Sequence, residues 1–243
     1  MNLTEKVALV TGGAKRVGKA ITLALAAHGC RLVVHYHTSA EAAEETLSDL
    51  ASINCEAIAL QADITQEAEV DRMIDAAVQR FGRIDILVNN AAVFFRTPIE
   101  TLTAEDIEHV IDTNLTGTFI CAQKIGLRMY DWGTGHIINM ADVAGQRPWV
   151  DYVPYSVAKA SILTLTQGLA MELAPKVMVN AVVPGPVLFQ DDTPGNVRKR
   201  EIDKTLVKRA GTPEEVAELV AFIAESDYST GAIFHIDGGR VLT

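Results

Sequence analysis

Residues 7–18 read Val7-Ala8-Leu9-Val10-Thr11-Gly12-Gly13-Ala14-Lys15-Arg16-Val17-Gly18, an apolar run that leads directly into a glycine-rich turn. The apolar run predicts a buried strand, and the pattern from Val17 to His28 predicts a helix after the turn. Glycines here let the backbone approach a pyrophosphate at the helix N-terminus, where free N–H groups and the helix dipole favour anions. Structural turns also have this composition, but this turn follows the first strand of a β-α-β pattern, as dinucleotide binding requires.

Apolar runs and helical patterns alternate along the rest of the chain, which predicts a doubly wound α/β fold with a parallel sheet covered by helices on both faces. Most runs are continuously apolar, as expected of strands buried on both faces. The expected strands are Val7–Val10, Leu32–Tyr36, Ala57–Gln61, Ile84–Val88, Gly135–Met140, Val177–Val183 and Ile233–Ile236. The expected helices are Val17–His28, Ala40–Ser52, Glu67–Phe81, Ala104–Met129, Tyr152–Leu173 and Pro213–Ala224.

The composition favours a single cytoplasmic domain over residues 1–243. The chain carries 21 Lys and Arg against 31 Asp and Glu, a net charge of −10, so neither nucleic acid nor an anionic membrane is an expected partner. No run reaches the roughly 18–20 apolar residues of a membrane span, and no signal-peptide pattern opens the sequence. The cysteines Cys30, Cys55 and Cys121 are odd in number and lie among mostly apolar residues, which is typical of reduced thiols.

Residues 184–200 form one long irregular stretch that mixes proline, glycine and charge. Segments of this length tend to be lids or binding loops. We therefore expect a substrate loop here.

The second expected strand ends in His35-Tyr36-His37-Thr38-Ser39 and has no acid at its end. An acid there usually holds the ribose 2′-hydroxyl of NAD. Arg16 and the residues His37–Ser39 instead offer donors where a 2′-phosphate would lie, and a guanidinium binds phosphate through two N–H groups. Arg16 could also be a solvated loop residue, but with the missing acid it favours NADPH. His35 and His37 lie on one side of the expected strand and could suggest a metal site. No convergent set of Cys, His or carboxylate side chains accompanies them, so no metal is expected.

Tyr155 and Lys159 lie four residues apart in Tyr155-Ser156-Val157-Ala158-Lys159, on one face of an expected helix. A phenol with a pKa near 10 is a slow acid or base at neutral pH, and a nearby ammonium lowers that pKa. An isolated pair of this kind is usually an ordinary surface helix turn. Tyr152 has no lysine four residues on, so Tyr155 is the stronger candidate.

In order and over nearly the whole chain, these motifs resemble those of the short-chain dehydrogenase/reductase family. They are the Thr11–Gly18 turn, Asp63, Asn89-Asn90-Ala91, Asn114, Tyr155 with Lys159, Pro184-Gly185 and Asp237-Gly238-Gly239. The resemblance implies a single Rossmann-like domain of about seven strands that binds a nicotinamide dinucleotide and transfers a hydride.

The resemblance also implies roles for the matching residues. Tyr155 would donate a proton, Lys159 would tune it and hold the nicotinamide ribose, and Asn114 would support a proton relay. Asp63 would contact the adenine. The residues implied to line the cofactor are Gly12, Arg16, Val17, Tyr36, His37, Thr38, Ser39, Asp63, Ile64, Asn89, Ala91, Met140, Tyr155, Lys159, Pro184 and Gly185.

Two positions depart from the family pattern. Arg16 replaces a glycine, and Asp142 replaces a serine that the family has thirteen residues before the tyrosine. A serine hydroxyl can donate to a ketone oxygen as that oxygen gains negative charge. An ionised aspartate would oppose this charge unless Asp142 stays protonated. A carboxylate instead suits an N–H donor or a ring nitrogen awaiting a proton, which favours a C=N bond in a nitrogen heterocycle.

Both departures resemble the pteridine reductase and dihydromonapterin reductase-like branch of the family, in which an aromatic at the position of Phe94 stacks on the pterin. Phe94 could also be a core residue, and Thr38 and Ala92 differ from that branch. The leading hypothesis is an NADPH-dependent reductase of a dihydropterin or dihydrofolate-like substrate, with Asp142 acting beside Tyr155, Lys159 and Asn114. The expected substrate contacts are Phe94, Asp142, Tyr155 and Leu188.

Two other functions stay open. One is a carbonyl reductase, for instance of 3-oxoacyl thioesters, in which Asp142 is a harmless variant. The other is a cofactor-binding protein without catalysis, which the intact Asn114, Tyr155 and Lys159 disfavour. The helix Tyr152–Leu173 has apolar residues on more than one face, and family members often pair such helices, so we expect a homotetramer.

Overall fold

The computed structural model describes residues 1–189 and 193–243. In these residues one sheet of seven parallel strands has the order β3-β2-β1-β4-β5-β6-β7. The strands are β1 (Val7–Val10), β2 (Arg31–Tyr36), β3 (Ala57–Gln61), β4 (Ile86–Asn89), β5 (Gly135–Met140), β6 (Val177–Pro184) and β7 (Ile233–Ile236). The order reverses between β1 and β4, which confirms the predicted Rossmann-like, doubly wound α/β fold.

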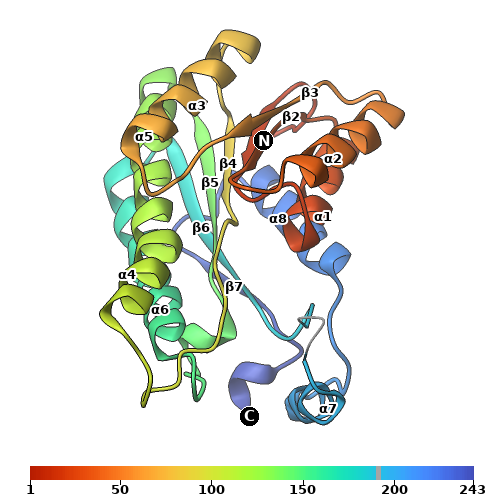
Figure 1. Cartoon of the computed structure of the whole chain (residues 1–243). Coiled ribbons are helices and arrows are strands. Elements are labelled where there is room, and N and C mark those ends of the chain that lie inside the picture. The colour runs from red at the N-terminus through yellow and green to blue at the C-terminus, as the bar shows by residue number, and fades with distance from the viewer. Residues whose placement is uncertain (190–192) are drawn as a thin grey trace.

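Helices cover both faces of the sheet (Figure 1). One face carries α1 (Arg16–Ala27), α2 (Ala40–Ser52) and α8 (Pro213–Glu225); the other carries α3 (Glu67–Phe81), α4 (Ala104–Ile111), α5 (Gly117–Trp132) and α6 (Val153–Leu173). A further helix, α7 (Gly195–Lys204), lies beside the C-terminus.

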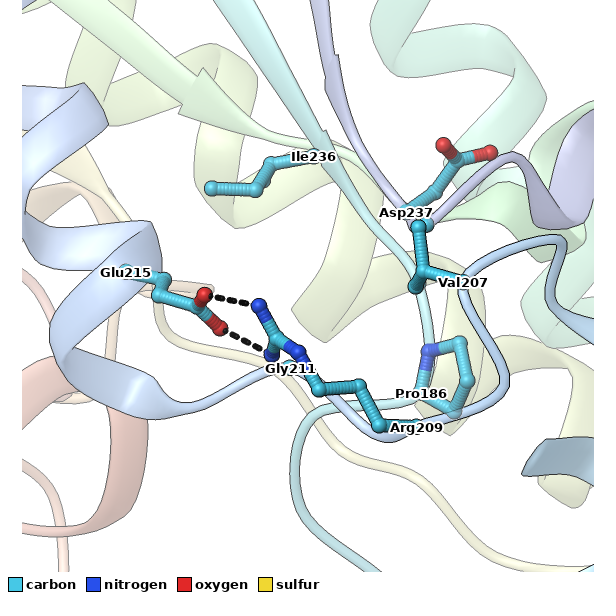
Figure 2. Close-up of a pocket in the computed structure, with 9 residues that line it drawn as sticks. Pro186, Val207, Arg209, Gly211, Glu215, Ile236 and Asp237 are labelled. Carbon is cyan, nitrogen blue, oxygen red and sulfur yellow. Dashed lines mark hydrogen bonds and ion pairs between the residues drawn. The ribbon is translucent and has the colours of Figure 1, made fainter.

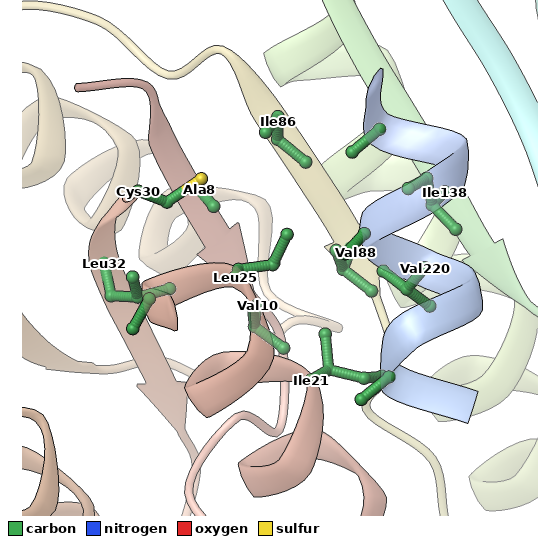
Figure 3. Close-up of a cluster of buried hydrophobic side chains, with 14 of the residues drawn as sticks. Ala8, Val10, Ile21, Leu25, Cys30, Leu32, Ile86, Val88, Ile138 and Val220 are labelled. Atoms are coloured by element: carbon green, nitrogen blue, oxygen red, sulfur yellow. The ribbon is translucent and has the colours of Figure 1, made fainter. Parts of the chain in front are cut away.

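The two faces of β1 explain its continuous apolar sequence. Ala8 and Val10 pack with Ile21 of α1 and Val220 of α8 in one buried cluster (Figure 3). Val7 and Leu9 point into a second buried cluster beneath α3 and α5. Both sides of the strand are therefore core, as predicted.

The start of α8 follows the local sequence. Thr212 Oγ1 accepts a hydrogen bond from Glu215 N at 3.2 Å, and Glu215 Oε2 accepts one from Thr212 N at 2.9 Å. This capping box, with Pro213 in the first turn, satisfies N–H groups that a helix start leaves unpaired.

The single helix expected over Ala104–Met129 is wrong. α4 ends at Ile111, a π-helix occupies Asp112–Thr116, and α5 begins at Gly117. The π-helix adds one residue to a turn without a proline to mark it, so the helical pattern continues across it in the sequence.

The description of 184–200 as wholly irregular is also wrong, because α7 begins at Gly195. None of its residues is buried, so it lacks the apolar periodicity by which a helix is recognised. Residues 190–192 of this predicted substrate loop lie outside the described residues. Within the described ranges, no helix is long and apolar enough to cross a membrane.

Candidate active site

The predicted catalytic side chains lie beyond the carboxyl ends of the strands. Asp142 follows β5, Tyr155 and Lys159 lie in the first turns of α6, and Asn114 lies in the π-helix. In open α/β sheets, ligands bind at this edge, close to the reversal in strand order.

Tyr155 and Asp142 form a direct hydrogen bond: the phenol donates to Asp142 Oδ2 at 3.1 Å. The other carboxyl oxygen accepts from Ala144 N at 2.7 Å, in the short turn after β5. Lys159 Nζ donates to Met140 O at 2.7 Å and lies 5.7 Å from the centre of the Tyr155 ring. The structure therefore brings Met140, Asp142, Tyr155 and Lys159 together.

Burial controls the protonation of this cluster. It raises the pKa of Asp142 to about 6, although Ala144 N, Lys159 and Tyr155 favour the charged form. It lowers the pKa of Lys159 to about 8 against the attraction of Asp142.

Burial also raises the pKa of Tyr155, and the charge of Asp142 and its hydrogen bond raise it further. The lowering of this pKa that the sequence predicts from Lys159 is therefore outweighed. The phenol keeps its proton, and Asp142 changes protonation near neutral pH.

Asn114 is buried and fixes the segment that carries Phe94. Its Oδ1 accepts from Val93 N at 2.8 Å, and its Nδ2 donates to Val93 O at 2.9 Å. Val93 and Phe94 pack in the cluster that contains Tyr155. The side chain of Asn114 thus holds one wall of the site.

The glycine-rich turn fits the pyrophosphate of a dinucleotide. Gly12 has a φ of +62°, and a Cβ on Gly18 would lie 2.1 Å from Gly12 O, so the turn packs closely against the start of α1. The N-cap residue of α1, Lys15, makes no side-chain hydrogen bond to the first turn of the helix. The backbone N–H groups of that turn can therefore bind an anion. Arg16 is exposed and has a φ of 55°, a backbone conformation that favours the glycine it replaces.

His35 and Asn90 have roles in this turn that the sequence did not predict. His35 Nδ1 accepts from Gly12 N at 3.0 Å, and His35 Nε2 donates to Ala62 O at 2.9 Å. Burial lowers the pKa of His35, so the ring stays neutral and can accept this bond. Asn90 Nδ2 donates to Thr11 O at 3.0 Å. The sequence did carry a signal for both roles: His35 is a polar residue near the end of the apolar strand β2, and Asn90 directly follows β4.

Some predicted cofactor residues lie around the turn. His37 and Thr38 are exposed after the half-buried Tyr36, and Ser39 is the N-cap of α2. Ala91 N donates to Thr11 Oγ1 at 3.0 Å and so lies against the turn. Val17 lies in the first turn of α1.

Other predicted cofactor residues have structural partners of their own. Asp63 Oδ1 accepts from Thr65 N at 3.0 Å, and the buried Ile64 lies against Gly117. Asn89 Nδ2 donates to Asn139 Oδ1 at 2.9 Å.

The Pro184-Gly185 pair also has a structural role. Pro184 ends β6, and a Cβ on Gly185 would lie 2.6 Å from Asp237 Cα. Gly185 N donates to Ile236 O at 3.1 Å. This glycine therefore lets the segments after β6 and β7 approach each other.

Phe94 belongs to an aromatic cluster rather than standing alone. Its ring stacks on Tyr152 with centroids 4.5 Å apart and planes 8° apart. It makes an edge contact with Tyr155 at 4.9 Å and another with Trp149 at 6.1 Å. One face of Phe94 is therefore already covered. Leu188 is 42% exposed in the segment after β6.

A pocket between the ends of β6 and β7 and the start of α8 is a separate feature (Figure 2). Arg209 and Glu215 face each other there in a two-pronged ion pair, with Nη1 to Oε2 at 2.9 Å and Nη2 to Oε1 at 2.5 Å. None of the predicted catalytic residues, all of which the structure describes, lines this pocket, but the predicted cofactor residue Gly185 does. Because the two charges satisfy each other, the pocket adds no catalytic group to those already described.

Known proteins resemble this chain over nearly its whole length. A family profile described as enoyl-(acyl carrier protein) reductase matches residues 12–240. The chain is similar to a 3-oxoacyl-(acyl-carrier-protein) reductase of Synechocystis, with 40% identity over 99% of this chain and 98% of that protein. A 3-oxoacyl-(acyl-carrier-protein) reductase of Staphylococcus epidermidis is 34% identical over 98% of this chain and 100% of its own length.

The same fold occurs in a crystal structure of a putative gluconate dehydrogenase from Agrobacterium tumefaciens. The TM-score is 0.92 at 31% identity, and the match covers 100% of this chain and 98% of that chain.

The expected pterin reductase, and its placement in the pteridine reductase branch, are wrong. Full-length relatives carry 3-oxoacyl reductase names, which agrees with the alternative carbonyl reductase hypothesis. The physical error lies in giving too much weight to the ionised form of Asp142 when choosing between a C=N bond and a carbonyl. With its pKa raised to about 6, the carboxyl exchanges its proton near neutral pH, and its protonated form donates to a carbonyl oxygen instead of opposing it.

Proposed function

The chain belongs to the short-chain dehydrogenase/reductase family, and we propose that it is an NADPH-dependent carbonyl reductase of 3-oxoacyl thioesters. The observation that carries the proposal is the hydrogen-bonded pair of Tyr155 and Asp142 beside Lys159. Tyr155 keeps its proton at neutral pH, and Asp142, with a pKa of about 6, is protonated mainly below that pH. When Asp142 is protonated, the two side chains offer two donors side by side, which suits an oxygen that becomes negatively charged.

In this proposal the bound NADPH supplies the hydride to the carbonyl carbon. Tyr155 donates its proton to the carbonyl oxygen, which becomes a hydroxyl. Protonated Asp142 donates a second hydrogen bond to the same oxygen in place of the family's serine. Lys159, charged below its pKa of about 8, stabilises the phenolate that Tyr155 becomes. Asn114 holds the wall at Val93 and supports return of the proton.

The choice of NADPH rests on the region around the nucleotide turn. Arg16 keeps a left-handed backbone, and the exposed positions after β2 contain no acid. A carboxylate there would repel a 2′-phosphate, whereas a guanidinium binds it. The glycine turn and the uncapped start of α1 fit the pyrophosphate.

A homotetramer in the cytoplasm, with one domain over residues 1–243 and a substrate loop within residues 184–200, stays a prediction of this proposal. The support for the tetramer is a set of exposed apolar side chains on α5 and α6, including Phe119, Leu127 and Val157. Light scattering tests the tetramer, and the mass of a monomer would contradict it.

The direct test of the activity is the loss of NADPH absorbance when the purified protein is offered acetoacetyl thioesters of coenzyme A and of acyl carrier protein. We expect turnover that Tyr155→Phe lowers by about a thousandfold. Glucose and gluconate with NADP serve as the comparison for sugar oxidation. Turnover on these sugars alone would reject the thioester while keeping the enzyme class.

A further inference from the structure

Helix α7 has only two apolar side chains, Val197 and Ile202, and both are half-buried. None of its residues is buried, and its sequence is Gly195-Asn196-Val197-Arg198-Lys199-Arg200-Glu201-Ile202-Asp203-Lys204. It lies apart from the two helical layers, beside the C-terminus (Figure 1). Most helices in proteins are stabilised by packing an apolar face, so the position of α7 must depend on polar partners instead.

One side of α7 is connected to the nucleotide turn. The Arg198 guanidinium lies 6.0 Å from the centre of the Phe189 ring, in the segment after β6. The carbonyl of Phe189 accepts a hydrogen bond from Arg16 Nη2 at 3.5 Å. Through Phe189, α7 therefore reaches the arginine proposed to bind the 2′-phosphate.

The other side of α7 is bound to the C-terminal turn by a largely buried ion pair. Arg240 Nη2 lies 3.1 Å from Glu201 Oε2, and the two side chains are 6% and 19% exposed. Arg240 belongs to the short helical turn Arg240–Leu242, which Asp237 fixes by accepting from Gly239 N at 2.9 Å and Val241 N at 2.8 Å.

The C-terminal turn in turn contacts the segment that carries Asp142. Arg147 Nε donates to Val241 O at 2.8 Å. Arg147 N donates to Val143 O at 2.8 Å, and Gly145 N donates to Asp142 O at 3.0 Å. Contacts therefore run from α7 through the Arg240–Leu242 turn to the residue beside the proposed proton donor.

We infer that the Arg240–Glu201 ion pair is the positioning device that holds α7 between the nucleotide turn and the Asp142 segment, and thereby sets the affinity for substrate. Arg240 and Glu201 act through other residues, so they are positioning residues rather than catalytic ones. The inference deepens the proposed function, and its kinetic part rests on that function.

The test compares the unmodified protein with Arg240→Gln, Glu201→Gln and the double variant. In Glu201→Gln, the buried Arg240 loses its carboxylate partner. In Arg240→Gln, Glu201 keeps Lys204 of its own helix at 2.8 Å but loses its link to the C-terminal turn. We expect the KM for acetoacetyl thioester to rise about tenfold in each, with kcat within about twofold. The double variant is expected to be no worse than either single one, because both act on one pair. Arg240→Lys keeps the charge and is expected to restore most of the lost affinity.

Limited trypsin digestion gives a second readout that needs no substrate. Cleavage at Arg198-Lys199-Arg200, mapped by mass spectrometry, is expected to be faster in Arg240→Gln than in the unmodified protein. Arg83→Gln is the matched control, because Arg83 Nε pairs with the buried Asp85 at 2.8 Å before β4, at the opposite edge of the sheet. This control is expected to lose stability while keeping both KM and the cleavage rate in α7.

Each outcome decides one of the two proposals. Unchanged KM and unchanged α7 cleavage in Arg240→Gln would overturn the positioning role. The same rise in KM in Arg83→Gln would also overturn it, since the effect would then be general destabilisation. If the unmodified protein reduces no thioester, the proposed function fails, and the cleavage rate in α7 alone decides whether the ion pair positions this helix.

Discussion

Two aspartates lie at opposite ends of the parallel strands, Asp85 at the amino ends and Asp142 at the carboxyl ends, and they have different partners. Asp85 precedes β4, where Oδ2 accepts from Val7 N at 3.0 Å and Oδ1 lies 2.8 Å from Arg83 Nε and 3.6 Å from Lys6 Nζ. Asp142 follows β5, where it accepts from Ala144 N and from the Tyr155 hydroxyl. One carboxyl faces two cations, and the other faces a neutral phenol, with Lys159 bound to Met140 O.

The difference separates stability from chemistry. A buried carboxylate with cations beside it contributes to the fold, because removing it would leave those cations without a partner. A buried carboxyl with weaker compensation holds a proton up to a higher pH, as the pKa of about 6 for Asp142 shows. We therefore expect changes at the amino ends of the strands to affect the free energy of unfolding. Changes at the carboxyl ends are expected to affect turnover.

The largest expected effect is at Tyr155. Tyr155→Phe removes the proton donor and one hydrogen bond to Asp142, and we expect kcat for thioester reduction to fall by about a thousandfold. The midpoint of urea unfolding is expected to change little. Measurement of both on one preparation checks the separation, and full activity in this variant would end the proposed role of Tyr155.

The next largest effect is at Asp85. Asp85→Asn leaves Arg83 and Lys6 without their buried partner and is expected to lower the free energy of unfolding by about 3 kcal/mol. Urea titration measures this loss, and kcat measured well below the unfolding temperature is expected to stay unchanged. Asp142→Asn is the matched variant at the other end of the strands, with a stability change of about 1 kcal/mol or less. Equal losses of stability in Asp85→Asn and Asp142→Asn would contradict the proposed difference between the two aspartates.

A smaller effect is the pH dependence set by Asp142. Its pKa rises from the ordinary 3.8 to about 6, so the carboxyl is protonated, and able to donate, below about pH 6. We expect kcat/KM for reduction to be level below that pH and to fall by at most tenfold per unit above it. The decline near pH 6 is expected to disappear in Asp142→Ser, whose hydroxyl donates at every pH. A decline that persists in this variant would assign it to another group.

The same shift has a consequence for stability. Because the folded state binds this proton more tightly than the unfolded chain, the contribution of Asp142 is fully present below about pH 4 and is lost as pH rises through about 6. Urea titrations of the unmodified protein and Asp142→Asn over this window check the sign.

The smallest effect is at the strained Arg16. Arg16→Gly removes the left-handed arginine backbone at φ 55° and is expected to raise the free energy of unfolding by about 1 kcal/mol. It also removes a guanidinium from the expected phosphate position, so the preference for NADPH over NADH is expected to fall about fivefold. Cofactor titrations by fluorescence measure the second effect. An unchanged preference would mean that His37–Ser39 bind the phosphate without Arg16.

Much of the fold was readable from local patterns, and the exceptions have physical causes. Strands such as β1 are apolar on both faces, and the Thr212–Glu215 capping box marks the start of α8, so these elements lie where expected. The π-helix was missed because an added residue leaves no compositional mark. Helix α7 was missed because none of its residues is buried, so no apolar face marks it, and its ion pair with the distant Arg240 leaves no local pattern.

In the active site, too, features set by neighbouring residues were predicted, and features set by residues far apart in the sequence were not. The spacing of Tyr155 and Lys159 put both on one face of α6, as the structure has them. The protonation of Asp142 depends on its burial in the folded chain, so its raised pKa was not predictable from the local sequence. The role of His35 was missed because its partner, Gly12 N, lies in another part of the chain.

The π-helix over Asp112–Thr116 has a consequence for insertions and deletions. Successive residues of a helix are about 100° apart around its axis, so one added residue turns the helix that follows. Val110 before it faces the cluster around Tyr155, whereas Cys121 and Ile125 after it face the core of the sheet. Removing any one residue of this turn would point one of these faces in the wrong direction. At this place the length of the chain is fixed as strictly as the identity of Asn114, whose side chain holds Val93.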